Sequence, residues 1–336
     1  MVISNDTTIL ITGGTGSFGK KFIEVVLEKY PNIKKLIIFS RDELKQWELQ
    51  QKYPENHFPQ LRFFLGDVRD QYRLKRALEG VDIVIHAAAL KQVPAAEYNP
   101  FEFIRTNVIG SDNLINACID SDVKVVISLS TDKASSPINL YGASKLCADK
   151  LFIAANNIKG SRNLKFSVVR YGNVMGSRGS VIPLFIEKSK TGTIPVTDLN
   201  MTRFNITLKN AVDMVLWSVE NCFGGEIVVP KIPSYKILDL VEAIAPNCEI
   251  QEIGLRSGEK IHEEMISVFD SPYTLDIGNY YLIFPSNKIL FNEYIKKNPG
   301  AQKVPYEFSY SSEKNIINLT VEELRELIKS NISKFF

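Results

Sequence analysis

Two side chains in the middle of the chain have types and spacing suited to proton transfer. Tyr141 and Lys145 are four residues apart in a stretch with a helical pattern, so they would lie on one face of a helix. An ammonium group beside a phenol stabilises the phenolate, which lowers the pKa of the tyrosine. A phenolate could take the proton of a sugar hydroxyl while hydride leaves the same carbon. Because this spacing occurs by chance in many helices, its meaning depends on the residues before it.

A strand-like run and an acid–base pair precede these side chains. Residues 124–130 are apolar and rich in β-branched residues, and the run is short enough to be a buried strand. Thr131, Asp132 and Lys133 follow directly, and turn formers separate them from Tyr141. A hydroxyl, a carboxyl and an amine at the end of a strand could orient a substrate and exchange protons with it. A loop lysine without a chemical role is the alternative interpretation of Lys133.

The N-terminal part of the chain has the pattern of a nucleotide-binding loop. An apolar strand is expected over residues 8–12, and three glycines spaced three apart follow it before an amphipathic helix. Glycine permits a tight turn and a close approach of the backbone to a pyrophosphate, whose charge lies at the helix N-terminus. The alternative is a glycine-rich turn without a ligand. We predict a dinucleotide site that includes Gly13, Thr15, Gly16, Ser17, Phe18 and Gly19.

The end of the next predicted strand bears on the choice between NADP and NAD. That strand covers residues 35–39, and Ser40, Arg41 and Asp42 follow it, with Lys45 one helical turn later. An acidic residue at the strand tip would bind the ribose diol of NAD, whereas a hydroxyl and two cations suit the 2′-phosphate of NADP. We predict NADP, and Asp42 keeps NAD as the alternative. A solvated helix start without nucleotide contacts is the other interpretation.

Two further strands are predicted over residues 61–65 and 82–86. Asp67 follows the first, where an aspartate can accept a hydrogen bond from the adenine amino group. Ala87 follows the second, where small residues would let a cofactor pass over the strand end. His86 lies within an apolar run, so we interpret it as a core or turn histidine rather than a general base.

Strand and helix patterns alternate from residue 8 to about residue 172. This alternation is typical of an α/β protein with a doubly wound parallel sheet of the Rossmann type. Beyond it the alternation fades, and helical patterns remain near residues 209–220, 236–245 and 320–330. We predict a dinucleotide-binding domain over residues 1–172 and a smaller, mainly substrate-binding lobe over residues 173–336, parts of which return to the first domain.

Composition excludes several classes of protein. Forty basic residues against 38 acidic residues give a net charge of +2, which indicates neither nucleic-acid binding nor an acidic tail. The four cysteines are scattered without a C-x-x-C pair, which favours buried free thiols in a reducing compartment and no metal site. The N-terminus lacks the pattern of a signal peptide, and no apolar run could span a bilayer. We predict a cytoplasmic protein with no membrane partner.

The glycine loop together with Tyr141 and Lys145 resembles the extended short-chain dehydrogenase/reductase superfamily. Longer stretches are similar to the inverting UDP-N-acetylglucosamine 4,6-dehydratases, and the resemblance covers nearly the whole chain. These stretches are ITGGTGSFG (11–19), SRDELK (40–45), AAALK (87–91), STDKA (130–134), RYGNV (170–174), MTRF (201–204), GEI (225–227) and RSGEK (256–260). The chain has Gln92 and Ser257 where the family usually has histidine and proline. Neither difference removes a charged or catalytic group.

The resemblance implies a substrate, further contacts and an assembly. The substrate would be UDP-N-acetylglucosamine, in the pathway to pseudaminic acid for flagellin glycosylation or in surface polysaccharide synthesis. The family commonly forms homo-oligomers, dimers or larger, possibly hexamers. Further cofactor contacts would be Val68, Lys91, Thr106, Tyr141 and Lys145, and substrate contacts would be Lys91, Asn173, Val181, Arg203, Arg256 and Glu259, with Tyr310 a weaker candidate.

The identity of the acid–base pair separates this family from its neighbours. Retaining sugar-nucleotide 4,6-dehydratases carry an aspartate and a glutamate after the threonine, and 4-epimerases usually lack an acid–base pair there. Asp132 and Lys133 therefore argue against both alternatives. A non-catalytic NADP-binding sensor, the most distant alternative, would commonly lose the Tyr141–Lys145 pair.

The resemblance implies a net elimination of water in three steps. Tyr141 as phenolate, helped by Lys145, takes the proton of O4 while hydride moves to the cofactor, and Thr131 binds O4. Lys133 then removes the C5 proton, which the new 4-keto group acidifies, while Asp132 protonates the leaving C6 hydroxyl. Finally hydride returns to C6, and C5 is reprotonated on the opposite face. We expect burial, Lys145 and the nicotinamide to lower the pKa of Lys133 from about 10.4, so that it can act as a base.

Overall fold

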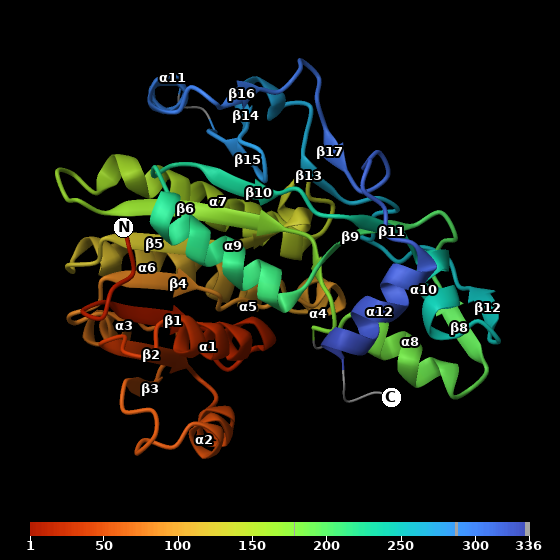
Figure 1. The fold of residues 1–336 in the computed structure, drawn as a ribbon, viewed down its shortest axis with the longest axis horizontal. Coiled ribbons are helices and arrows are strands. Elements are labelled where there is room, and N and C mark those ends of the chain that lie inside the picture. Colours follow the sequence, from red (N-terminus) through yellow and green to blue (C-terminus); the bar gives the residue numbers. More distant parts are fainter. Residues whose placement is uncertain (178, 286–287, 333–336) are drawn as a thin grey trace.

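A ten-stranded sheet forms the centre of the computed structural model, which describes residues 1–177, 179–285 and 288–332 (Figure 1). Its strand order is β16-β14-β15-β10-β6-β5-β4-β1-β2-β3. The pairs from β3 across to β10 are parallel, and β15, β14 and β16 extend the sheet in antiparallel fashion. The strands are β1 (Thr8–Thr12), β2 (Lys35–Ser40), β3 (Leu61–Leu65), β4 (Ile83–His86), β5 (Val125–Thr131), β6 (Lys165–Tyr171), β10 (Ile227–Pro230), β14 (Thr274–Asp276), β15 (Tyr280–Ile283) and β16 (Gln302–Lys303).

Helices cover both faces of this sheet. On one face α1 (Ser17–Lys29) packs against α9 (Leu208–Asn221), which crosses in front of the strands in Figure 1. The other face carries α3 (Gln71–Ala77), α6 (Gly110–Ile119) and α7 (Leu140–Ile158). The central strands are buried on both sides, which explains their continuous apolar sequences. The remaining helices of this half are α2 (Glu43–Lys52), α4 (Val93–Tyr98), α5 (Pro100–Phe103), the π-helix η1 (Ile104–Ile109) and the 3-10 turn η2 (Asp132–Ala134).

The strand order reverses between β1 and β4, which creates the crevice where open α/β sheets bind ligands. The loop after β1 reaches this crevice through Gly13, whose φ of +67° is a left-handed conformation that favours glycine. A Cβ at Gly13 would lie 2.8 Å from the backbone nitrogen of Ala88 after β4. The glycine therefore allows the two strand ends to approach closely.

The C-terminal lobe is built from short strands and three helices around its own core. The strands are β7 (Asn173–Val174), β9 (Thr202–Ile206) and β11 (Ser234–Lys236) in one sheet, β8 (Thr193–Val196) with β12 (Glu249–Glu252), and β13 (Glu264–Ile266) with β17 (Tyr310–Ser311). Helices α8 (Val181–Ser189), α10 (Ile237–Ile244) and α12 (Val321–Asn331) enclose the lobe's core. The 3-10 turn η3 (Ser271–Tyr273) and α11 (Lys288–Lys297) lie in the segments that return to the large sheet.

The predicted fold class is confirmed, since this is a doubly wound Rossmann sheet with a smaller C-terminal lobe. The predicted strands agree with β1 to β5 within a residue at each end, and the three C-terminal helical patterns correspond to α9, α10 and α12. The cysteines are free, but Cys147 is exposed on α7 rather than buried.

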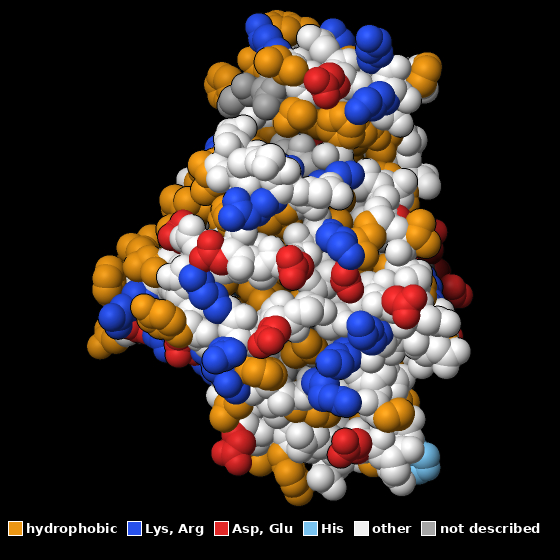
Figure 2. Space-filling view, turned by 90° about the vertical axis from the view of Figure 1, so that its left-hand side faces the viewer, with side chains coloured by type: hydrophobic (Ala, Val, Ile, Leu, Met, Phe, Trp, Pro, Cys, Tyr) orange, Lys and Arg blue, Asp and Glu red, His pale blue; other side chains and the backbone are white. Residues whose placement is uncertain are grey.

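Basic and acidic side chains are interspersed over the face drawn in Figure 2, and the net charge of the whole chain is small. None of the described helices is long and apolar enough to cross a membrane.

Candidate active site

A single cleft of about 1890 Å³ brings together most of the predicted site residues. Its walls come from the loops after β1, β2, β4, β5 and β6 and from the C-terminal lobe. The predicted residues that line it are Gly13, Thr15, Gly16, Ser17, Phe18, Gly19, Asp42, Lys45, Ala87, Lys91, Thr131, Lys133, Tyr141, Lys145, Asn173, Val181, Arg203, Arg256 and Glu259. Residues from both halves of the chain thus face one space.

Other predicted residues lie outside the lining of the cleft, namely Ser40, Arg41, Asp67, Val68, Thr106, Asp132 and Tyr310. Tyr310 is a core residue whose hydroxyl donates to the carbonyl of Ile232 and accepts from its N–H, both at 2.9 Å. His86 is also in the core, where Thr12 lies 2.8 Å from Nδ1. Burial lowers the pKa of His86 to about 3, so the ring is neutral, as expected for a core histidine.

The two cations predicted at the end of β2 differ in their pairing, since Lys45 is bound to Asp42 and Arg41 lies at a longer distance from Asp67. The Asp42 carboxylate caps α2 by accepting from the N–H of Lys45 at 3.0 Å, and it also pairs with the Lys45 ammonium. The Ser40 hydroxyl lies 2.8 Å from that of Thr15. Arg41 keeps 54% of its side chain exposed, at 3.8 Å from Asp67. Arg41 is therefore the side chain best placed for a 2′-phosphate, and Asp42 and Lys45 satisfy each other.

Lys133 lies at the centre of the catalytic candidates. Its ammonium donates to Asp132 Oδ1 at 3.1 Å and to Asn173 Oδ1 at 3.3 Å, and it forms an ion pair with Glu263 Oε1 at 3.0 Å. The Thr131 hydroxyl donates to the same Asp132 oxygen at 3.0 Å. Asp132 is fully buried at the start of η2, and burial raises the pKa of its carboxyl.

Glu263 is the functional candidate that the sequence analysis missed. It comes from the C-terminal lobe, is 2% exposed and lines the cleft. Burial by itself lowers the pKa of Lys133, but the carboxylates of Asp132 and Glu263 outweigh it and raise that pKa above its usual value. The prediction that the pKa of Lys133 is lowered is therefore wrong, because the protein's own charged groups raise it. The nearby RSGEK stretch suggested a site, but nothing in the spacing indicated a glutamate three residues beyond it.

The Tyr141–Lys145 pair also differs from expectation. Burial raises the pKa of Tyr141 to about 12, and the charge of Lys133 offsets this only in part. Lys145 donates to the carbonyl of Leu129 at 2.7 Å, and burial lowers the pKa of its ammonium. Within the protein itself, the charge of Lys133 lowers the pKa of Tyr141 and so favours the phenolate.

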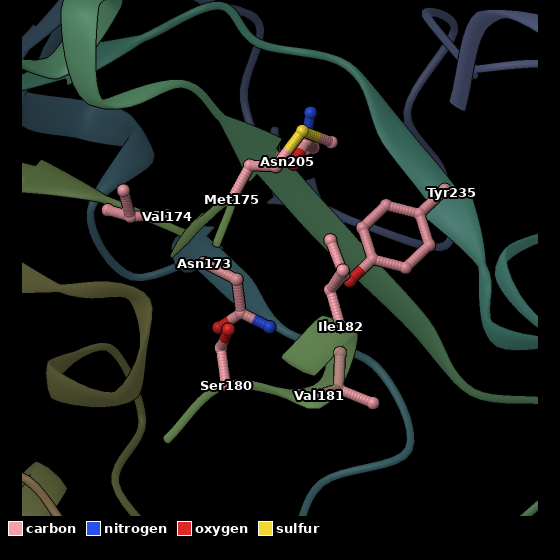
Figure 3. Close-up of a pocket in the computed structure, with 8 residues that line it drawn as sticks. All are labelled: Asn173, Val174, Met175, Ser180, Val181, Ile182, Asn205 and Tyr235. Carbon is pink, nitrogen blue, oxygen red and sulfur yellow. The ribbon is translucent and has the colours of Figure 1, made fainter. Parts of the chain in front are cut away.

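The substrate candidates gather on the lobe side of the cleft. Arg203 donates to the carbonyls of Thr202 at 2.8 Å and Ile261 at 2.7 Å, and its guanidinium lies 3.9 Å from Glu259. Asn173 and Val181 also line a small adjoining pocket with Ser180, Ile182 and Tyr235 (Figure 3). Desolvation in the cleft and the charge of Lys133 lower the pKa of Lys91. A polar, mainly cationic wall therefore faces the predicted nucleotide loop.

Comparison with known proteins agrees with this geometry. The model of the family described as polysaccharide biosynthesis protein matches residues 9–285. The chain belongs to this family. The protein is 53% identical to a UDP-N-acetylglucosamine 4,6-dehydratase (inverting) from Campylobacter jejuni, over 96% of this chain and 98% of that one. It is also 41% identical to a UDP-glucose 4-epimerase from Rickettsia canadensis, over 96% and 95% of the two chains.

Solved structures share the fold of this chain. The structure of Pen from Bacillus thuringiensis matches with a TM-score of 0.88 and 37% identity over 100% of both chains. The dTDP-glucose 4,6-dehydratase DesIV from Streptomyces venezuelae, bound to NAD and TYD, matches with a TM-score of 0.68 over 96% and 98% of the chains. At 22% identity, that second likeness supports the fold alone.

A buried ion pair in this family member supports the floor of the site. The carboxylate of Asp149 on α7 accepts from Arg170 at 3.2 Å and from Ser130 at 2.7 Å, and both partners of the ion pair are at least 96% buried. We expect Asp149→Asn to lower the free energy of unfolding by about 3–5 kcal/mol, because it leaves a buried guanidinium unpaired. Urea denaturation measures this effect. Asp120→Asn, in the exposed pair with Lys75, is the control and should change far less.

The backbone beneath Lys133 depends on a glycine in α7. A Cβ at Gly142 would lie 2.2 Å from the carbonyl oxygen of Lys133, so Gly142→Ala must displace η2, the turn that contains Asp132 and Lys133. We expect turnover to fall by roughly 100-fold, the order associated with a misplacement of about 1 Å, although alanine normally favours a helix over glycine. Steady-state kinetics measures this loss. Gly300→Ala, where a methyl group meets open space, should leave turnover unchanged.

Proposed function

We propose that the protein is a UDP-N-acetylglucosamine 4,6-dehydratase that inverts C5 and yields UDP-2-acetamido-2,6-dideoxy-β-L-arabino-hex-4-ulose. The observation that carries the proposal is the placement of Lys133 beside Tyr141 in one cleft, with the buried Asp132 carboxylate 3.1 Å from the Lys133 ammonium. A retaining enzyme would have glutamate at the position of Lys133. The 53% identity to the Campylobacter jejuni protein of that name adds support.

The glycine loop and the start of α1 fit a dinucleotide, because Gly13 and Gly19 leave no space for a side chain and the helix N-terminus favours a pyrophosphate. When bound, the nicotinamide accepts hydride from the sugar and later returns it. NADP is favoured over NAD by the exposed Arg41 and by the use of the Asp42 carboxylate as a helix cap. Mass spectrometry of nucleotide released from denatured protein would test this choice.

The proton transfers are assigned to three side chains, and two others support them. Tyr141 takes the proton of the O4 hydroxyl, which Thr131 orients, and Lys145 supports the tyrosine from the same helix. Lys133 in its neutral form removes the C5 proton, and the electrons of that C–H bond form the C5–C6 double bond. Asp132, whose pKa is raised by burial, gives its proton to the C6 hydroxyl, which leaves as water. C5 then gains a proton on the opposite face, while C6 gains the hydride that a bound nicotinamide would supply.

The lobe formed mainly by residues 173–336 is assigned to substrate binding, with residues 1–172 holding the cofactor. The candidates for UDP-sugar contacts are Lys91, Asn173, Val181, Arg203, Arg256 and Glu259, all of which line the cleft. Lysine and arginine suit the diphosphate because they form charge-assisted hydrogen bonds with its oxygens. In this proposal the lobe mainly determines which substrate binds, and residues 1–172 hold the cofactor that takes up and returns the hydride.

A cytoplasmic homo-oligomer is the expected form of the protein. Tyr98 and Phe101 expose 87% and 58% of their surface on adjoining helices, which suits a contact between copies. Light scattering after size-exclusion chromatography would give the number of subunits, and a monomer would contradict this part of the proposal.

Proton NMR of UDP-N-acetylglucosamine incubated with the protein in D₂O tests the function. We expect a 6-deoxy-4-keto sugar with deuterium at C5 and L-arabino coupling constants, without added redox cofactor. D-xylo product at the earliest times would favour a retaining enzyme instead. The second candidate, a UDP-sugar 4-epimerase, is favoured by the 41% identity to the Rickettsia canadensis protein, and it would return a C4 epimer with its C6 hydroxyl intact.

A further inference from the structure

The C-terminal lobe places a second carboxylate against Lys133. Glu263 Oε1 lies 3.0 Å from the Lys133 ammonium and 4.0 Å from Nε of Arg203, and its side chain is 97% buried. Asp132 faces the same ammonium from the other side at 3.1 Å. Lys133 therefore lies between two buried carboxylates that come from opposite halves of the chain.

The position of Glu263 is fixed by its backbone. Its N–H donates to the Ser312 hydroxyl at 2.9 Å, and its carbonyl accepts from the Ser312 N–H at 2.8 Å. Through these two bonds β17 holds the segment that carries Glu263. Its carboxylate therefore approaches Lys133 from a fixed backbone position.

Neighbours of Glu263 also hold the turn that contains Lys133. Lys260 donates to the carbonyl of Ser135 at 2.7 Å, and the Ser136 hydroxyl donates to Glu264 at 2.9 Å. Asn139 donates to the carbonyl of Gly258 at 2.7 Å. Ser136 has a φ of +45°, a conformation that residues other than glycine rarely adopt. The hydrogen bond to Glu264 is therefore made by a residue with a strained backbone. We call residues 258–264 the clamp segment, because it contacts residues 133–139 at four points.

Several charged groups act on Lys133, and the two carboxylates among them have the larger effect on its protonation. Asp132 and Glu263 favour its ammonium form, whereas Arg203 disfavours it. The remaining titratable groups coupled to it are Lys91, Tyr141, Tyr235 and Lys260. One oxygen each of Asp132 and Glu263 is buried and has no hydrogen-bond partner among the described residues. The oxygens that do have partners, Asp132 Oδ1 and Glu263 Oε1, are the ones that contact the Lys133 ammonium.

We propose that Glu263 is a positioning residue for proton transfer at C5: it orients the Lys133 amine between Asn173 and Asp132 and sets the pH at which the neutral base forms. This inference rests on the proposed function for its catalytic meaning. The other part of the inference, that the Glu263 carboxylate controls the protonation of Lys133, applies to the protein without substrate. The lobe thus controls the reactivity of a base carried by the sheet.

The test compares wild-type protein with Glu263→Gln, which keeps the size and removes the charge. Lysines are labelled with ¹³C at Cε, and the Lys133 signal is identified by its loss in Lys133→Arg. We expect that signal to titrate at least about one pH unit lower in Glu263→Gln, since an opposite charge within 4–6 Å shifts a pKa by about 1–3 units. Glu313→Gln removes an exposed charge of the same lobe near His262 and should leave the signal in place. An unchanged Lys133 titration in Glu263→Gln would overturn the proposal.

A kinetic measurement isolates the proton transfer from the hydride transfer. UDP-N-acetylglucosamine deuterated at C5 is supplied in H₂O, and exchange of that deuterium with solvent is followed against pH, because Lys133 removes the C5 hydrogen of the substrate. We expect the rising limb of this profile to move to lower pH in Glu263→Gln by the same amount as the NMR titration, with little change in KM. Loss of exchange at every pH would overturn the proposal, because Glu263 would then be the base itself. If wild-type protein does not turn over the sugar at all, the proposed function fails, while the NMR titration still decides the role of Glu263.

Discussion

Replacing Lys133 with arginine should stop the reaction after its first half. Arginine keeps a cation between Asp132 and Glu263, so both buried carboxylates stay paired, but its guanidinium does not lose a proton in proteins. Removal of the C5 proton should therefore fail, and overall turnover should fall by roughly 10²–10⁴-fold, the usual contribution of a general base. Tyr141 and Lys145 are unaltered, so oxidation at C4 should still occur.

Absorbance at about 340 nm separates the two halves of the reaction, because reduced nicotinamide absorbs there. Mixing Lys133→Arg with substrate should give up to one equivalent of reduced cofactor per site, with little dehydrated product by NMR. Lys209→Arg, in an exposed pair with Asp213, is the matched control and should turn over normally. Normal formation of the 6-deoxy product by Lys133→Arg would exclude the lysine as the base.

Replacing Tyr141 with phenylalanine should stop the reaction before any reduced cofactor forms. The variant keeps the ring and its packing but cannot accept the O4 proton, so hydride transfer should slow by roughly 10²–10⁴-fold. In the same absorbance experiment we expect no signal, in contrast to Lys133→Arg. A signal of normal size from Tyr141→Phe would assign the O4 proton to another group.

The pH dependence of the wild-type protein provides a check on this assignment. Burial raises the pKa of Tyr141 to about 12, and the phenolate is the reactive form. Its fraction therefore rises about tenfold per pH unit below that value, and the rate of the first half should rise with pH through the neutral range. Tyr72→Phe is the matched control for Tyr141→Phe, because Tyr72 is 85% exposed and lies outside the cleft.

Local sequence patterns predicted the fold and the glycine turn after β1 well, because both depend on short-range chemistry. The buried strands are continuous apolar runs, and Gly13 adopts the left-handed φ that its loop requires. The pairing of Asp42 with Lys45 is local too, but it was not foreseen. An aspartate just before a helix tends to cap it, and that bond takes the carboxylate away from a ribose.

The electrostatics of Lys133 could not be predicted in the same way. Its pKa depends on Glu263, which is 130 residues away in sequence and reaches the site through the fold of the C-terminal lobe, where β13 pairs with β17. Burial alone would lower that pKa, so the sequence analysis had the right sign for one contribution and lacked the larger, opposing one. Long-range contacts of this kind leave no periodic or motif signal in a single sequence.

The strand order has a consequence for how the chain can be divided. β10 lies beside β6, so Val168 and Val169 pair with residues 227 and 228 from beyond the predicted boundary. A fragment that stops at residue 172 would leave β6 with an open, apolar edge, and such edges pair with other chains. Isolation of the nucleotide-binding half should therefore yield aggregates unless β10 is supplied as well. The predicted boundary near residue 172 is therefore not a place where the chain can be cut.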